Sequence, residues 1–151
     1  MTRINFDMIK LRLQKSIFLH NPSYRQPSRG EVIALGLSLR NAADFSQNGS
    51  LANFLQCFKT QTGPDVPFSL EVEFAAVFAL SSPAAAQADQ DTLIHKLFPQ
   101  LVFPYTREYV AETTRRGGYP PLILNLGLFQ DSQTSGSGTA TESICGSKWP
   151  H

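Results

Sequence analysis

The chain has 151 residues, a length that suggests a single domain. Hydrophobic residues make up 42% of it and charged residues 17%, a charged share below the usual value of about 25% that argues against a highly charged disordered protein. The formal net charge of +1 argues against a strongly basic nucleic-acid-binding protein.

The cysteines and the apolar runs limit the class of protein further. Cys57 and Cys145 are far apart and form no CxxC motif, so we expect ordinary thiols, no structural disulfide and no metal site. The N-terminus lacks the uninterrupted apolar region of a secretory signal. The longest apolar run, Phe74–Leu80, has seven residues, whereas a membrane-spanning helix needs about 20. We therefore expect a cytoplasmic protein without membrane insertion.

Four segments show the two-residue hydrophobic period of strands, at about 9–20, 32–42, 51–60 and 68–80. The apolar residues of the first segment are predicted to share one face: Ile9, Leu11, Leu13, Ile17 and Leu19. In the third segment, Phe54 and Phe58 are predicted to lie on one face, and Leu55 and Cys57 on the other. Long strands joined by turns predict an antiparallel meander with one buried face.

A helical period begins after Asp91. Pro99 and Pro104 interrupt it, so we expect two helices or one kinked helix, with Pro104 placed well as a first helical residue. Gly117-Gly118 is predicted to end the helix, and Glu112 is within reach of the two arginines that precede the glycines. One face of this helix is a candidate for subunit association, with packing inside one chain as the equal alternative: Leu93, Leu97, Leu101, Tyr105 and Tyr109.

The composition changes near the C-terminus. Residues 1–129 are predicted to form the folded domain, and residues 130–151 a flexible tail rich in Ser, Thr and Gly.

Few residue patterns point to catalysis. The chain has no phosphate-binding glycine loop, and His20 and His95 have no partners at ligand spacing. Glu71 and Glu73 share a strand face, which could be an acid–base pair, a partner-docking site or, most simply, a solvated face. We expect no enzymatic activity and no cofactor.

Two motifs carry a family resemblance. The segment 97–108, LFPQLVFPYTRE, and its continuation 115–124, RRGGYPPLIL, resemble the SecB protein-export chaperone family. The resemblance implies an α+β fold, in which a four-stranded antiparallel sheet is followed by helices, and a homotetramer built as a dimer of dimers. Members of the family hold precursor proteins unfolded without ATP and pass them to the SecA motor. A divergent branch guards the antitoxin of a toxin–antitoxin pair.

The resemblance also assigns candidate site residues. Leu35, Leu37 and Leu39 lie where the family binds its clients, although filling the core is the alternative. Glu71 matches a carboxylate of the motor-docking surface, but Ser16 and His20 stand at the first-strand positions where the family has carboxylates.

Three functions follow as hypotheses. The first is an ATP-independent holdase that keeps unfolded or precursor polypeptides competent for export. The second is a SecB-like chaperone dedicated to an antitoxin. The third is a module that binds one folded partner and has no general holdase activity.

Overall fold

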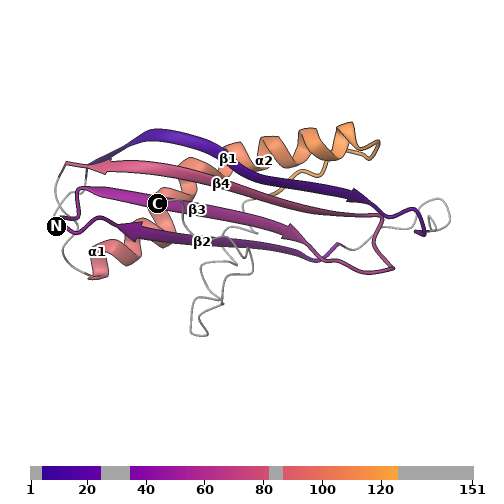
Figure 1. Ribbon diagram of the computed structural model, residues 1–151, viewed down its shortest axis with the longest axis horizontal. Coiled ribbons are helices and arrows are strands. Elements are labelled where there is room, and N and C mark those ends of the chain that lie inside the picture. The colour runs from indigo at the N-terminus through magenta and orange to yellow at the C-terminus, as the bar shows by residue number, and fades with distance from the viewer. Residues whose placement is uncertain (1–4, 25–34, 82–86, 126–151) are drawn as a thin grey trace.

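A computed structural model describes residues 5–24, 35–81 and 87–125. Within these ranges four strands precede one helical run (Figure 1). The strands are β1 (Phe6–His20), β2 (Leu37–Phe45), β3 (Leu51–Thr60) and β4 (Phe68–Leu80), and the helical elements are α1 (Gln87–Thr92), η1 (Leu93–Leu97) and α2 (Phe98–Arg116). The predicted α+β class is confirmed.

The strands form one antiparallel sheet in the spatial order β1-β4-β3-β2. β2, β3 and β4 follow one another as a meander, and β1 pairs with the outer side of β4, so β1 and β2 are the two edge strands. β2 begins and ends later than the predicted segment at 32–42, because the turn to β3 starts only after Phe45. The part of that predicted segment before residue 35 lies outside the described residues.

The alternation predicted for β3 is confirmed. Phe54 and Phe58 are fully buried beneath the helical run, and Leu55 and Cys57 point to the opposite face. Every second residue of β4 from Phe68 to Leu80 lies on the helix-covered face and is buried. The core therefore lies between one face of the sheet and the helices.

β1 does not place its apolar residues on one face. Two β-bulges, at residues 8–10 and 13–15, each shift the alternation by one residue. A one-residue shift moves all later side chains to the other face. Leu11 therefore packs against the core, whereas Ile17 and Leu19 point away from the helices and are 39% and 61% exposed.

The helical run is continuous rather than two separate helices. In the π-helix η1 the N–H of Phe98 donates to the carbonyl of Leu93, five residues back. Pro99 then occupies the first turn of α2, where its missing N–H costs little. Pro104 lies inside α2, so the prediction that it begins a helix is wrong. The neighbouring Phe103 is buried in the core, and such burial offsets the cost of a proline inside a helix.

Phe98 joins the helical run to all four strands. Its ring stacks on Phe78 of β4 with centroids 4.1 Å apart, and it contacts Phe6 of β1, Phe45 of β2 and Phe54 of β3 at 5.4, 6.3 and 5.7 Å. Because such ring pairs add to the free energy gained by burial, this position anchors the helical run. From there α2 crosses the sheet diagonally towards β1 (Figure 1).

The C-terminal end of α2 follows the prediction. Glu112 accepts hydrogen bonds from Arg115 at 2.6 Å and Arg116 at 2.9 Å, and these bonds lower the pKa of its carboxyl to about 2. Gly118 has φ +88°, a conformation that favours glycine, and the helix ends at Arg116. The N–H of Leu122 donates to Thr114 Oγ1 at 2.9 Å, which holds the segment after the helix against α2.

In the described ranges, no helix is both long enough and apolar enough to cross a membrane. The predicted folded domain, residues 1–129, contains all the described elements, while the predicted tail lies outside the described residues.

The first testable prediction concerns Gly117, which follows α2 and lies against the ring of Phe18 on β1. A Cβ atom at this position would lie 2.7 Å from Phe18 Cε1, and the ring is held by Phe68 and Tyr119 at centroid distances of 5.4 and 6.2 Å. Gly117→Ala should therefore lower the free energy of unfolding by about 1–3 kcal/mol, measured by urea denaturation. In a Phe18→Leu background the cost of the same substitution should shrink; an equal cost in both backgrounds would contradict the steric explanation.

Candidate functional site

The apolar residues at the β2 edge of the sheet form the first candidate site. Among the described residues no strand pairs with the outer side of β2, and this side is called the open edge. Leu37 and Leu39 lie on the helix-covered side of β2, and Leu35 precedes that strand. Leu35 and Leu37 are partly buried and pack against the core, and Leu39 is buried with 5% exposure. These residues contribute to the core and also line the edge of the sheet, and their role in client binding stays a prediction.

The backbone pairing of β2 determines which of its main-chain groups face outwards. Hydrogen bonds from Ser46 N–H to Leu51 O and from Gln61 N–H to Gly36 O mark the two ends of the β2–β3 ladder. In an antiparallel pair, hydrogen-bonded residues alternate with residues whose backbone groups point to the other side. The even-numbered residues of β2 therefore bond to β3. The odd-numbered ones, including Leu37 and Leu39, direct their N–H and C=O groups to the open edge.

A polar relay crosses the apolar layer beside this edge. Thr106 Oγ1 of α2 donates to Gln56 Oε1 of β3 at 2.6 Å, and Gln56 Nε2 donates to Asn41 Oδ1 of β2 at 2.9 Å. Thr106 and Gln56 are fully buried, and Asn41 is partly buried. No sequence pattern described above predicts this group. The one available signal was Gln56, a polar residue at a position of β3 where the alternation requires an apolar one.

The predicted association face of the helix divides into buried and exposed parts. Leu93 is fully buried in the core of the single chain. Leu97 and Tyr109 are partly buried, and the Tyr109 hydroxyl donates to Ser16 Oγ at 2.7 Å. Leu101 and Tyr105 are 43% and 45% exposed. Of the five residues, these two leave the most apolar surface for a second chain.

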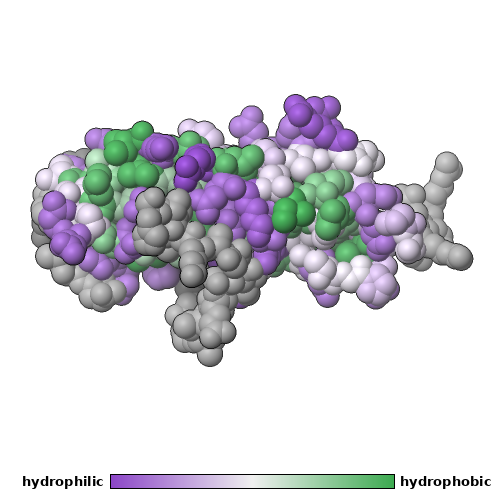
Figure 2. Space-filling view, in the orientation of Figure 1, coloured by the Kyte–Doolittle hydropathy of each residue, from purple (hydrophilic) through white to green (hydrophobic). Residues whose placement is uncertain are grey.

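The face of the sheet opposite the helices carries an ion cluster around Glu71. The Glu71 carboxylate lies 2.9 Å from Lys15 Nζ of β1 and 3.5 Å from Lys59 Nζ of β3, and its side chain is 19% exposed. The hydrogen bond to Glu71 raises the pKa of Lys15 above its usual value. On the face of the molecule shown in Figure 2, apolar side chains form separate patches with polar side chains between them. The positive charges of the two lysines thus balance the negative charge of the Glu71 carboxylate.

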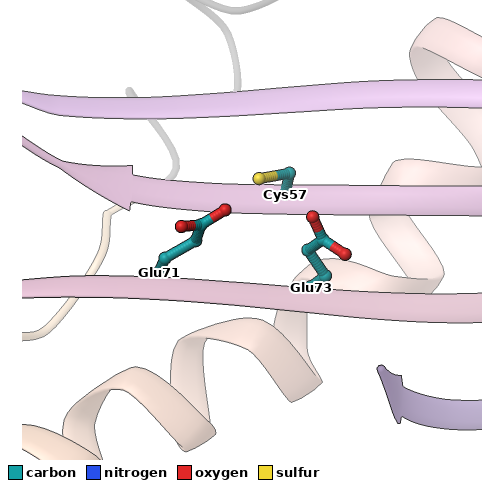
Figure 3. A group of neighbouring side chains, drawn as sticks. All are labelled: Cys57, Glu71 and Glu73. Carbon is teal, nitrogen blue, oxygen red and sulfur yellow. The ribbon is translucent and has the colours of Figure 1, made fainter. Parts of the chain in front are cut away.

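Glu71 also belongs to a group with metal-ligating side chains, together with Glu73 and Cys57 (Figure 3). The ligand atoms of the three residues lie within 4.8 Å of one another. Cys57 is disulfide-bonded, so its sulfur is not available as the thiolate that binds metals. This corrects the expectation of an ordinary thiol without a disulfide at Cys57. The same expectation for Cys145 lies outside the described residues. Because the lysines also engage Glu71, we assign no metal site here.

His20 lies at the exposed end of β1. Its Nδ1 is 2.5 Å from the Tyr119 hydroxyl, which in turn donates to the Pro67 carbonyl at 3.0 Å. The histidine therefore helps to hold the segment after α2 at the end of the sheet.

A second prediction tests the ion cluster. In Glu71→Gln the pKa of Lys15 should fall towards about 10.4, measured by NMR titration of the lysine side chain. A raised pKa in the folded state contributes stability below the unfolded pKa, and this contribution is lost as the pH rises through the folded value. Glu71→Gln should thus lower the free energy of unfolding by up to about 1 kcal/mol at pH 7, and by less above pH ~10.5. Glu112→Gln, at the distant helix end, is the control; an unchanged Lys15 pKa in Glu71→Gln would refute the pairing.

Comparisons with known proteins identify the family. A family model described as preprotein translocase subunit SecB matches residues 36–132. The protein-export protein SecB of Mesorhizobium japonicum is 31% identical over 117 residues, which cover 74% of this chain and 67% of that protein. SecB of Rhodopseudomonas palustris is 36% identical over 115 residues, with coverages of 74% and 69%. For SecB of Hyphomonas neptunium, 30% identical, the match spans 66% of the relative's length.

A solved structure supports the fold. The SecB-like chaperone of Mycobacterium tuberculosis, in complex with a ChAD peptide from the HigA1 antitoxin, superimposes with a TM-score of 0.65 and 21% identity. The match covers 80% of this chain and 89% of that one. The sheet, the helical run and the match over most of the described residues agree, and the chain belongs to the SecB family.

Proposed function

We propose that the chain is an ATP-independent chaperone that holds unfolded or precursor polypeptides. The observation that carries the proposal is the apolar row of Leu35, Leu37 and Leu39 at an open sheet edge, in a chain that belongs to the SecB family. An apolar row binds side chains of many sequences, and outward-facing backbone groups can bond to any extended segment. No step of this function requires catalysis or a cofactor. We propose that the protein performs it in the cytoplasm.

The identity of the client leaves two forms of the proposal. Relatives named protein-export proteins support export of precursors. The antitoxin peptide bound to the Mycobacterium tuberculosis chaperone supports a dedicated antitoxin client. Both forms need the same property, which is capture of an extended chain.

Transfer of clients to a SecA motor is a further proposal, and it is the part that the charges support least. Docking through Glu71 needs a carboxylate whose charge is free to attract a partner. Here Lys15 and Lys59 lie beside that carboxylate. Glu73, on the same face, is fully buried. We therefore base the proposed function on client binding and not on motor docking.

A third prediction tests client binding. A probe protein is kept folded or is reduced and unfolded, and binding is measured without nucleotide. Only the unfolded form should bind. Leu37→Ser should weaken that binding by about 1–2 kcal/mol, whereas Leu51→Ser, at an exposed residue on the opposite face, should leave it unchanged.

Three outcomes would contradict the proposal. Binding of neither form would mean that the chain has no holdase activity. Preferential binding of the folded form would favour the alternative of a module with one folded partner. Equal effects of the two serine substitutions would place the client elsewhere. Circular dichroism of each variant verifies that it is folded.

A fourth prediction concerns assembly, for which we propose the dimer of dimers that the family resemblance implies. Leu101 and Tyr105 present exposed apolar surface on α2. Leu101→Arg should place a charge in the contact and lower the mass measured by light scattering after gel filtration. Ile123→Arg, which changes an apolar residue that is 57% exposed beyond the helix, is the control. An unchanged mass for Leu101→Arg, or an equal loss in both variants, would remove this face as the interface.

A further inference from the structure

The Asn41 side chain at the edge of β2 is oriented by a chain of hydrogen bonds. Thr106 Oγ1 donates to Gln56 Oε1, which leaves the Gln56 amide nitrogen facing β2. That nitrogen donates to Asn41 Oδ1, so the oxygen of the Asn41 amide faces the core. The NH₂ group of Asn41 must then point away from Gln56. Two fully buried residues thereby fix the direction of a donor on an edge strand.

The donor at Asn41 is also available. Among the described residues, no acceptor bonds to Asn41 Nδ2, and the only buried side-chain polar atom without a partner is Gln14 Oε1. The Asn41 nitrogen is therefore in contact with solvent. A buried donor without an acceptor would cost about 1–3 kcal/mol, whereas an exposed one costs nothing until a ligand covers it.

The surroundings of Asn41 are apolar. On its side of β2 its neighbours along the strand are Leu39 and Ala43, and beyond them Leu37 and Phe45, all of them buried or partly buried. Asn41 is an odd-numbered residue of β2, so its main-chain groups face the open edge together with those of its neighbours. An oriented donor thus stands in the middle of an apolar row.

From this arrangement we propose that Asn41 is a client-binding residue that donates its side-chain N–H to a main-chain carbonyl of a polypeptide lying along β2. The occupant is an extended segment of an unfolded chain, because such a segment has a carbonyl at every residue. Gln56 and Thr106 are positioning residues that act through Asn41. The inference rests on the proposed function and adds to it the hydrogen bond that fixes where the bound segment lies.

The substitution Asn41→Asp removes the outward donor and keeps the rest of the relay. The aspartate keeps an oxygen that accepts from Gln56 Nε2, but it replaces the outward N–H with an oxygen that repels a carbonyl. The matched control is Asn53→Asp, the same chemical change at an exposed residue of β3 on the opposite face. Gln56→Met provides a second variant, which leaves the Asn41 donor in place and removes the group that orients it.

The probe is a fluorescent nine-residue peptide of Leu, Val and Ala with blocked ends, which has acceptors only in its main chain. Asn41→Asp should weaken its binding roughly 10-fold or more, since a hydrogen bond is lost and a repulsion is added. Gln56→Met should weaken binding less, by about 3-fold, and Asn53→Asp should leave it unchanged. Thermal unfolding verifies that each variant is folded.

Four results would overturn the assignment. Wild-type affinity of Asn41→Asp, or an equal loss in Asn53→Asp, would exclude a specific donor. An effect seen only with a peptide that carries Ser and Asn side chains would exclude the main-chain carbonyl. A changed mass of Asn41→Asp without peptide would mean that a second copy of the chain covers this edge. If the wild type fails to bind both the peptide and the unfolded probe protein, it is the proposed function that fails.

Discussion

The stack of Phe98 on Phe78 determines where everything else in the fold can lie. Phe98 follows a π-helical turn, and its ring contacts one phenylalanine from each strand. Burying a ring of this size stabilises the fold by about 1.5–3 kcal/mol, and aromatic pairs add to that. The contact fixes only one end of α2, so the direction of the helix depends on contacts further along it.

Two polar contacts set that direction. Thr106 meets Gln56 near the middle of the sheet, and Tyr109 reaches Ser16 on β1. Apolar side chains tolerate sliding of a helix over a sheet, but a hydrogen bond between buried groups, such as that of Thr106 with Gln56, is satisfied in only one position. The exposed bond between Tyr109 and Ser16 adds a second point of contact. The resulting diagonal directs Leu101 and Tyr105 outwards. The helical run also starts over the β2 edge and ends over the β1 edge. The two edges of the sheet therefore have different surroundings.

Much of this architecture follows from sequence patterns, and the exceptions have local causes. Alternation located β3 and β4 correctly because nothing interrupts their pairing. The same rule was wrong for Ile17 and Leu19, since a bulge has no signature in the hydrophobic period. Pro104 was predicted to begin a helix because propensity favours proline there, yet burial of Phe103 overrides that preference. Glu71 forms ion pairs with Lys15 and Lys59, which precede it by 56 and 12 positions in the sequence. Only the strand register brings these residues together.

The two faces of the sheet show why a shared fold does not imply shared partners. On the face away from the helices, Glu71 is balanced by Lys15 and Lys59, so this surface offers little long-range attraction to a basic partner. On the helix side, the polar relay is surrounded by apolar residues, where a hydrogen bond is strengthened by the low local dielectric. An apolar row by itself leaves a bound chain free to slide by one residue or more, because its contacts are not directional. A directed hydrogen-bonding group in that row favours the alignments that place a main-chain carbonyl at the donor over those in between, and it does so without reading any side chain of the client.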